Sequence, residues 1–154
     1  MNVIKSEGQP SRAIRPLNSL RLLRKRTVLV ADNDPATVSV LSKLATRDQF
    51  ELLAVSDGAE AYRLLKSNAD FEAAIINMSI PNIKGLDIVR YMKTENRLKR
   101  IPVIIVTEND GLEKIIESFS AGAVALFPKP FDREQLWRMV RSVSEQPWQR
   151  TRAA

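Results

Sequence analysis

The sequence predicts one doubly wound α/β domain, in which a parallel sheet is covered by helices on both faces. The first observation is that short apolar runs alternate with helix-like stretches between residues 27 and 145. The second is the run at 74–76, which is continuously apolar and ends at a turn signal. Such a run is typical of a strand that is buried on both faces of a parallel sheet. Strand–helix alternation favours parallel pairing through right-handed crossovers.

Five strands are predicted, each from a short apolar or β-branched run. In order they cover 27–31, 50–55, 72–77, 102–107 and 124–127. With a helix after each strand this is a (βα)5 pattern, and a flavodoxin-like strand order of 2-1-3-4-5 is expected for this length. In that order the carboxyl ends of strands 1 and 3 meet at the switch point, where open α/β sheets place their sites.

Each helix is predicted from an apolar stripe at helical spacing, and four of the five begin at an aspartate. A short carboxylate side chain before a helix accepts hydrogen bonds from its first backbone N–H groups. The four predicted caps are Asp34, Asp57, Asp110 and Asp132. The third helix is expected over roughly 85–96, while Gly122 ends the fourth in a left-handed conformation and Pro147 stops the last.

Composition excludes several classes of chemistry. The 154 residues contain no cysteine and no histidine. Disulfides, thiolate catalysis, the commonest general base and the commonest zinc ligand are therefore absent. Hydrophobic residues at 44% and charged residues at 27% are typical of a soluble globular protein. No apolar run approaches the length of a membrane span, so a cytoplasmic protein is expected.

The excess of positive over negative charge lies in the N-terminal segment of the chain. Residues 1–26 hold seven of the 24 basic residues and one of the 18 acidic residues. The remaining chain therefore has 17 basic and 17 acidic residues and no net charge. We expect 1–26 to be a flexible basic arm, with a short helix possible in 17–26, and 146–154 to be a C-terminal tail. The domain itself is predicted over 27–145.

The residue at the end of the third strand decides what chemistry the switch point can support. That residue is Asn77, an amide, and the first strand is followed by Asp32 and Asn33. These three residues are the candidate site at the switch point.

Over about 27–144 the chain resembles the receiver domain of two-component response regulators. The resemblance rests on several landmarks that occur in the family's order. They are the loop Asp32-Asn33-Asp34-Pro35, the segment Asn77 to Pro81 with Gly85, Thr107, the pair Gly122-Ala123, and Lys129-Pro130-Phe131.

The resemblance implies a phosphoacceptor at position 77 and an acidic Mg2+ site in the first loop. In the family an aspartate stands where Asn77 stands and accepts a phosphoryl group from a histidine kinase. Of the two acidic loop positions, Asp32 keeps one and Asn33 occupies the other, while Asp34 is interpreted as the helix cap. An amide oxygen is a weak nucleophile, and Mg2+ is usually anchored by carboxylates. We therefore expect little or no phosphorylation at Asn77, no required cofactor, and at best weak Mg2+ binding at Asp32.

The resemblance adds Thr107, which ends the fourth strand, and Lys129, which follows the fifth, to the pocket. These two residues are expected to hold one conformation without phosphate. In the family the lysine pairs with the phosphorylated site and the threonine hydroxyl follows the phosphoryl oxygens. Here Lys129 is expected to pair with Asp32 and to hydrogen-bond Asn77, and Thr107 to do likewise. The resemblance also implies a cis peptide bond before Pro130.

The resemblance suggests an interaction face as well. The family commonly dimerises or binds targets through helix 4, strand 5 and helix 5 of the receiver. The candidates on that face are Phe119, Leu126 and Trp137. Leu126 replaces the family's switch aromatic. Trp137 lies just off the apolar stripe of the last helix, so packing and an interface role stay open for it.

The leading hypothesis is a stand-alone atypical receiver that acts as a phosphorylation-independent protein-interaction module, with no enzymatic activity. Its partner would be a histidine kinase, an output protein or a second copy. The main alternative is a conventional phosphorelay receiver whose natural residue 77 is aspartate. Asn33 argues against it, because one trapping substitution would not also alter the first loop. A third hypothesis is an accessory protein that binds nucleic acid or other polyanions through the arm.

Overall fold

The structure is a computed structural model that describes residues 26–108 and 111–144. Five strands alternate with five helices along this part of the chain. The strands are β1 (Arg26–Ala31), β2 (Phe50–Val55), β3 (Ala73–Asn77), β4 (Val103–Thr107) and β5 (Ala125–Pro128). The helices are α2 (Pro35–Arg47), α3 (Gly58–Ser67), α4 (Gly85–Thr94), α5 (Leu112–Ala121) and α6 (Arg133–Ser144). The predicted elements are confirmed, with boundaries that shift by one or two residues.

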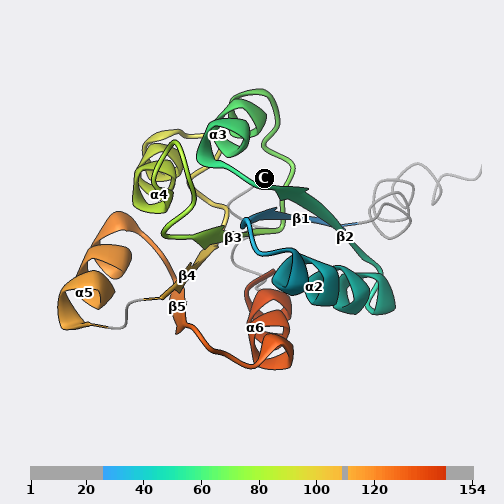
Figure 1. Cartoon of the computed structure of the whole chain (residues 1–154). Helices are drawn as coiled ribbons and strands as arrows, with labels where there is room; N and C mark the ends of the chain where they lie inside the picture. The colour runs from blue at the N-terminus through green and yellow to red at the C-terminus, as the bar shows by residue number, and fades with distance from the viewer. Residues whose placement is uncertain (1–25, 109–110, 145–154) are drawn as a thin grey trace, which may run out of the picture.

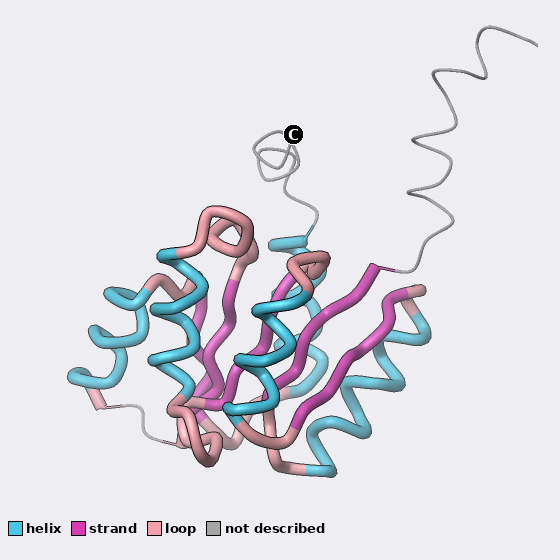
Figure 2. The backbone as a smooth tube through the Cα atoms, turned by 90° about the horizontal axis from the view of Figure 1, so that it is seen from above, coloured by secondary structure: helices cyan, strands magenta, loops and turns pink. Residues whose placement is uncertain are grey.

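The strands form one parallel sheet in the order β2-β1-β3-β4-β5, as predicted. Helices α3, α4 and α5 cover one face, and α2 and α6 cover the other (Figure 1). Figure 2 shows the strands running side by side between these helices. Because β1 and β3 are neighbours in register from Val28 with Ala73 to Ala31 with Ile76, their carboxyl ends open onto the same edge.

Two apolar layers hold the helices on the sheet. Successive residues of a strand point to opposite faces, so β1 and β3 each supply both layers. Leu29 and Ile76 belong to the layer under α3 and α4, whereas Val30 and Ile75 belong to the layer under α2 and α6. All five residues of β3 are buried, and so are all five of β4. The run at 74–76 is therefore continuously apolar because β3 is buried on both faces of the sheet, as predicted.

Three of the four predicted aspartate caps are confirmed. Asp34 accepts a hydrogen bond from the Ala36 N–H, and Asp57 accepts one from the Glu60 N–H. Asp132 accepts one from the Glu134 N–H. The fourth, Asp110, lies outside the described residues. Gly122 ends α5 with a φ of 119°, a left-handed conformation that favours glycine.

Trp137 is a packing residue, so its place among the interface candidates was wrong. It is fully buried between α6 and α2, where its ring meets Phe50 edge to face at 5.2 Å. Its indole N–H donates to the Asp48 carboxylate at 2.7 Å. Asp48 also pairs with Arg47 and Arg141, which ties α6 to the end of α2.

The predicted arm and tail lie outside the described residues, apart from Arg26. That residue opens β1, and its guanidinium lies 4.1 Å from the centre of the Phe50 ring. The helix expected over 17–26 likewise falls in the part that is not described. Within the described ranges no helix is long and apolar enough to cross a membrane.

Candidate functional site

The candidate site is built on the carboxyl ends of β1 and β3. Asp32 follows β1 and Asn77 ends β3, and each is 2% exposed. The Asn77 side-chain amide donates to Asp32 Oδ1 at 3.0 Å. The sequence-based prediction that these two residues meet is thus matched by a direct, buried contact.

The Asn77 side chain is engaged at both ends. Its carbonyl oxygen accepts a hydrogen bond from the Ser79 N–H at 2.9 Å, while its amide nitrogen donates to Asp32. Gly85 packs so closely against the backbone carbonyl of Asn77 that an added Cβ would lie 2.5 Å from that backbone oxygen. The loop after β3 therefore holds the amide in one orientation.

Asp32 is left with one free oxygen. Oδ1 accepts from the Asp34 N–H at 3.0 Å as well as from Asn77. Oδ2 is buried and has no hydrogen-bond partner among the described residues. A buried carboxylate oxygen without a partner is costly, so a water molecule or a cation is the expected neighbour.

The first loop does not supply the carboxylates that usually anchor Mg2+. Asn33 is exposed. Asp34 is engaged by the Ala36 N–H and by the Thr37 hydroxyl, and the hydrogen bond from Thr37 lowers the pKa of Asp34. Across residues 26–108 and 111–144, no group of three or more acidic residues is placed to hold a metal. The residues present do not fit a receiver-type Mg2+ site, although the buried Asp32 Oδ2 has no hydrogen-bond partner among the described residues.

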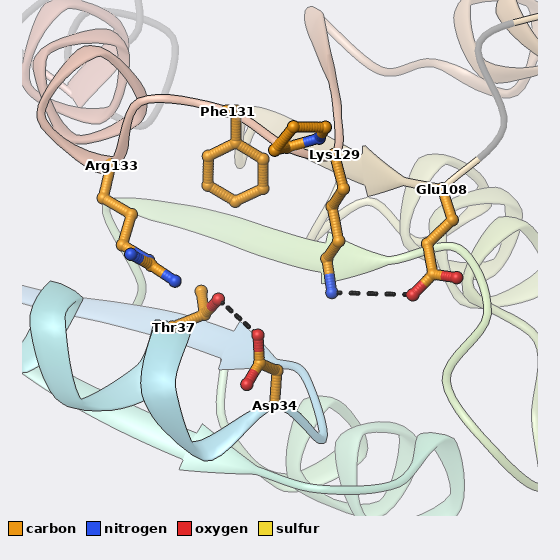
Figure 3. Close-up of a pocket in the computed structure, with 7 residues that line it drawn as sticks. Asp34, Thr37, Glu108, Lys129, Phe131 and Arg133 are labelled. Atoms are coloured by element: carbon orange, nitrogen blue, oxygen red, sulfur yellow. Dashed lines mark hydrogen bonds and ion pairs between the residues drawn. The ribbon is translucent and has the colours of Figure 1, made fainter.

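The sequence predicts an ion pair between Lys129 and Asp32, and the structure does not contain it. The Lys129 ammonium lies 3.9 Å from the Glu108 carboxylate, on the open side of the site (Figure 3). The physical reason is that Asn77 brings no negative charge and already occupies Asp32 Oδ1, so little draws the ammonium inward. The peptide bond between Lys129 and Pro130 is cis, as the resemblance implied.

Thr107 ends β4 beneath the site and is 1% exposed. Its hydroxyl lies 3.6 Å from the Met78 sulfur, in a contact that joins β4 to the loop after β3. The expected hydrogen bond to Asn77 does not form, because both ends of that amide have other partners.

An open pocket of about 510 Å3 lies beside the Asn77–Asp32 pair. The pocket lies between the start of α2, the end of β4 and the β5–α6 connection (Figure 3). Its lining residues are Asp34, Thr37, Glu108, Lys129, Pro130, Phe131 and Arg133. Sequence reasoning missed Thr37, Glu108 and Arg133. A signal was available for Arg133, because a basic residue at a helix N-terminus opposes the helix dipole.

The remaining interface candidates lie on or near α5. Phe119 is 48% exposed, and Leu112 and Ile116 on the same helix are 72% and 56% exposed. Their spacing places them on one side of the helix. Leu126 is half-buried against the core layer under α3 and α4.

Comparison with known proteins agrees with this geometry. The family described as response regulator receiver domain matches residues 28–141. Chemotaxis protein CheY1 of Helicobacter pylori is 31% identical over 110 residues, which are 71% of this chain and 89% of that protein. A CheY-like receiver domain protein from Methanospirillum hungatei has a similar structure, with a TM-score of 0.73, 20% identity, and coverage of 83% of this chain and 98% of that one.

The receiver domain of the sensor histidine kinase PA1611 from Pseudomonas aeruginosa is a second structural neighbour. It has a TM-score of 0.70 and 20% identity, and the match covers 80% of this chain and 100% of that domain. In that crystal structure a magnesium ion is coordinated in the active-site cleft. At these identities the structural neighbours establish the shared fold.

Proposed function

This chain belongs to the response regulator receiver domain family, and we propose that it acts in two-component-type signalling as a protein-interaction module whose conformation does not depend on phosphorylation. The observation that carries the proposal is the buried hydrogen bond from the Asn77 amide to Asp32. It occupies the position where the family forms an acyl phosphate.

The chemistry of phosphoryl transfer supports this reading. The reaction needs a nucleophilic oxygen in line with the donor and positive charge to neutralise the transferring group. Here the amide oxygen of Asn77 is weakly nucleophilic and is bound to the Ser79 N–H. Lys129 is turned toward Glu108, and one buried carboxylate, Asp32, remains.

We propose no enzymatic activity of another kind. The polar side chains near the site are committed to structural contacts, Thr107 to Met78 and Asn77 to Asp32. A general acid–base pair needs two titratable groups within reach of one substrate atom. Asp32 is buried and Lys129 pairs with an exposed carboxylate, so these two groups do not converge on one open position.

The partner-binding surface is proposed to be the exposed apolar side of α5. Leu112, Ile116 and Phe119 present large apolar side chains on one side of this helix. Such a row is costly to leave in water and is typical of a protein-binding face. The occupant would be a kinase, an output protein or a second copy of this chain.

One observation favours the alternative of a conventional phosphorelay receiver. Asp32 Oδ2 is buried without a hydrogen-bond partner among the described residues, and a cation would satisfy it. If that cation were Mg2+, the site would keep part of the family's charge pattern. In this alternative residue 77 of the natural protein is aspartate, so the two functions differ in whether a carboxylate acceptor stands at that position.

Intact mass before and after incubation with acetyl phosphate and Mg2+ tests whether the chain with Asn77 accepts a phosphoryl group. The wild-type chain is expected to keep its mass, because it has no acceptor carboxylate at position 77. The matched control is the double variant Asn33→Asp with Asn77→Asp, which restores both family carboxylates and is expected to gain one phosphoryl group. An adduct on the wild type would refute phosphorylation independence, and peptide mapping would then assign it to Asp32, Ser79 or another residue.

A further inference from the structure

The pocket beside the Asn77–Asp32 pair holds two cationic side chains that the proposed function does not use. Lys129 and Arg133 both line it, and Arg133 extends toward Thr37 across the opening (Figure 3). Asp32, Asn77 and Thr107 are not among the lining residues. The pocket therefore shares Lys129 with the candidate receiver site but is not lined by the buried Asn77–Asp32 pair.

Arg133 is placed where the fold gains little from it. It is the first residue of α6, and a positive charge at a helix N-terminus is unfavourable for the helix. Its side chain is half-buried, and no hydrogen bond or ion pair to it is formed within 26–108 and 111–144. An unpaired, partly desolvated guanidinium has all its donors available to an anion.

Lys129 is held weakly. Its side chain is 21% exposed, and its carboxylate neighbour Glu108 is 3.9 Å away with a side chain that is 70% exposed. An exposed ion pair at this distance contributes little. An incoming anion can therefore replace Glu108 at a small cost.

The other acidic residue of the pocket, Asp34, keeps its negative charge, because the hydrogen bond from Thr37 lowers its pKa, but its oxygens are occupied by its own helix. Asp34 Oδ1 accepts from the Ala36 N–H at 3.1 Å, and Oδ2 accepts from the Thr37 hydroxyl at 2.8 Å. Both oxygens are thus turned to the start of α2. This arrangement leaves Lys129 and Arg133 as the pocket side chains with unused hydrogen-bond donors.

An apolar wall lies between the two cations. The Phe131 ring lies between Arg133 and Lys129 in Figure 3, and Pro130 lines the pocket beside it. The ring is held by Phe127, with ring centres 6.1 Å apart at an interplanar angle of 74°. A ligand for this pocket would combine an anionic group with an apolar body.

We propose that this pocket binds a small organic anion, with its phosphate or carboxylate group between Lys129 and Arg133 and its apolar body against Phe131 and Pro130. The site would give this receiver a chemical input other than phosphorylation. The binding proposal stands on the pocket alone and does not depend on the proposed signalling role.

The test is a titration of the full-length 15N-labelled protein with phenyl phosphate, followed by amide chemical shifts. Phenyl phosphate supplies an anion and an apolar body, whereas inorganic phosphate and phenol supply one each. The variants are Arg133→Gln and Lys129→Gln. The matched control is Arg138→Gln, an exposed arginine on the same helix that does not line the pocket.

We expect saturable shifts at Thr37, Phe131 and Arg133, with a dissociation constant of about 1 mM, the range for so small a probe. Arg133→Gln and Lys129→Gln should each weaken binding about tenfold, as for loss of one charge-assisted hydrogen bond, and Arg138→Gln should not. Inorganic phosphate and phenol should bind about tenfold more weakly than phenyl phosphate.

Three results would overturn the proposal. They are the absence of saturable shifts, shifts that map to another surface such as α4, and equal affinity in the Arg133→Gln and Arg138→Gln variants. Phenyl phosphate transfers no phosphoryl group to a protein lacking an activated acceptor, so intact mass recorded on the same samples keeps this outcome separate from that of the phosphorylation test.

Discussion

Replacing Asn77 by aspartate tests how the site balances its charge. The substitution turns the hydrogen-bond donor that contacts Asp32 Oδ1 at 3.0 Å into a second carboxylate. Both groups are 2% exposed, so water screens them little. The family's aspartate would then exist here without the family's full set of metal ligands.

The expected cost follows from Coulomb's law. Two carboxylate charges centred about 4.5 Å apart repel by about 4 kcal/mol at an effective dielectric of ~20. The pair can instead take up one proton, which costs about 4 kcal/mol at pH 7 for a carboxyl of ordinary pKa and about 1.5 kcal/mol at pH 5. We therefore predict that Asn77→Asp lowers the free energy of unfolding by about 3–4 kcal/mol at pH 7.

The pH dependence has a definite sign. Repulsion raises a carboxyl pKa of the folded variant above its unfolded value, so the folded variant binds more protons. Relative to the wild type, the variant's stability is then lost as the pH rises from about 5 to 7. Mg2+ should restore stability by offsetting the charge, by about 2.7 kcal/mol at a hundredfold excess over its dissociation constant.

Urea denaturation at pH 5 and pH 7, with and without Mg2+, measures these effects. Asn77→Ala is the matched control, since it removes the hydrogen bond without adding charge and should show neither the pH nor the Mg2+ response. The reasoning is refuted if Asn77→Asp is as stable as the wild type at pH 7 without Mg2+. It is also refuted if Mg2+ stabilises the wild type as much as the variant.

Three further predictions concern the rest of the domain. Hydrogen bonds from Arg47 and Trp137 hold the pKa of Asp48 below its usual range, so its stabilising effect is complete above about pH 4 and is lost at lower pH. Asp48→Asn should therefore reduce the fall in the free energy of unfolding as the solution is acidified. An unchanged dependence of that free energy on pH would contradict this. Trp137→Phe should cost about 2–3 kcal/mol in urea denaturation, because it removes the hydrogen bond to Asp48 and leaves a small cavity; a loss below about 0.5 kcal/mol would show that the contact is dispensable. Ile116→Asp, on the exposed side of α5, should change the free energy of unfolding by less than about 0.5 kcal/mol. It should weaken partner binding or self-association at least tenfold, as measured by sedimentation. Unchanged association would exclude this side of α5 as the binding surface.

The strands, most helix starts and the strand order were predictable because their signals are local. The buried run ending at Asn77 and the caps Asp34 and Asp57 depend on neighbours a few residues away. The strand order then follows from alternation and handedness. The strand order alone was enough to predict that Asn77 and Asp32 lie next to each other.

The errors concern side chains whose partners are distant in the sequence. Trp137 lies off the apolar stripe of its own helix, and its burial depends on Asp48, 89 residues away. The direction of the Lys129 ammonium depends on the charges around it, and it pairs with Glu108 rather than with Asp32. The pocket with Arg133 combines three segments, so no single stretch of sequence could show it.

Addition of beryllium fluoride with Mg2+ tests most directly whether the Asn77–Asp32 pair closes the receiver site. Beryllium fluoride binds to a carboxylate oxygen as a tetrahedral phosphoryl mimic, so it reports an open acceptor without a covalent reaction. We predict that the amide spectrum of the wild-type chain does not change, whereas that of the Asn33→Asp, Asn77→Asp double variant shifts around Thr107 and Lys129. Saturable shifts at these residues in the wild type would contradict a phosphorylation-independent receiver.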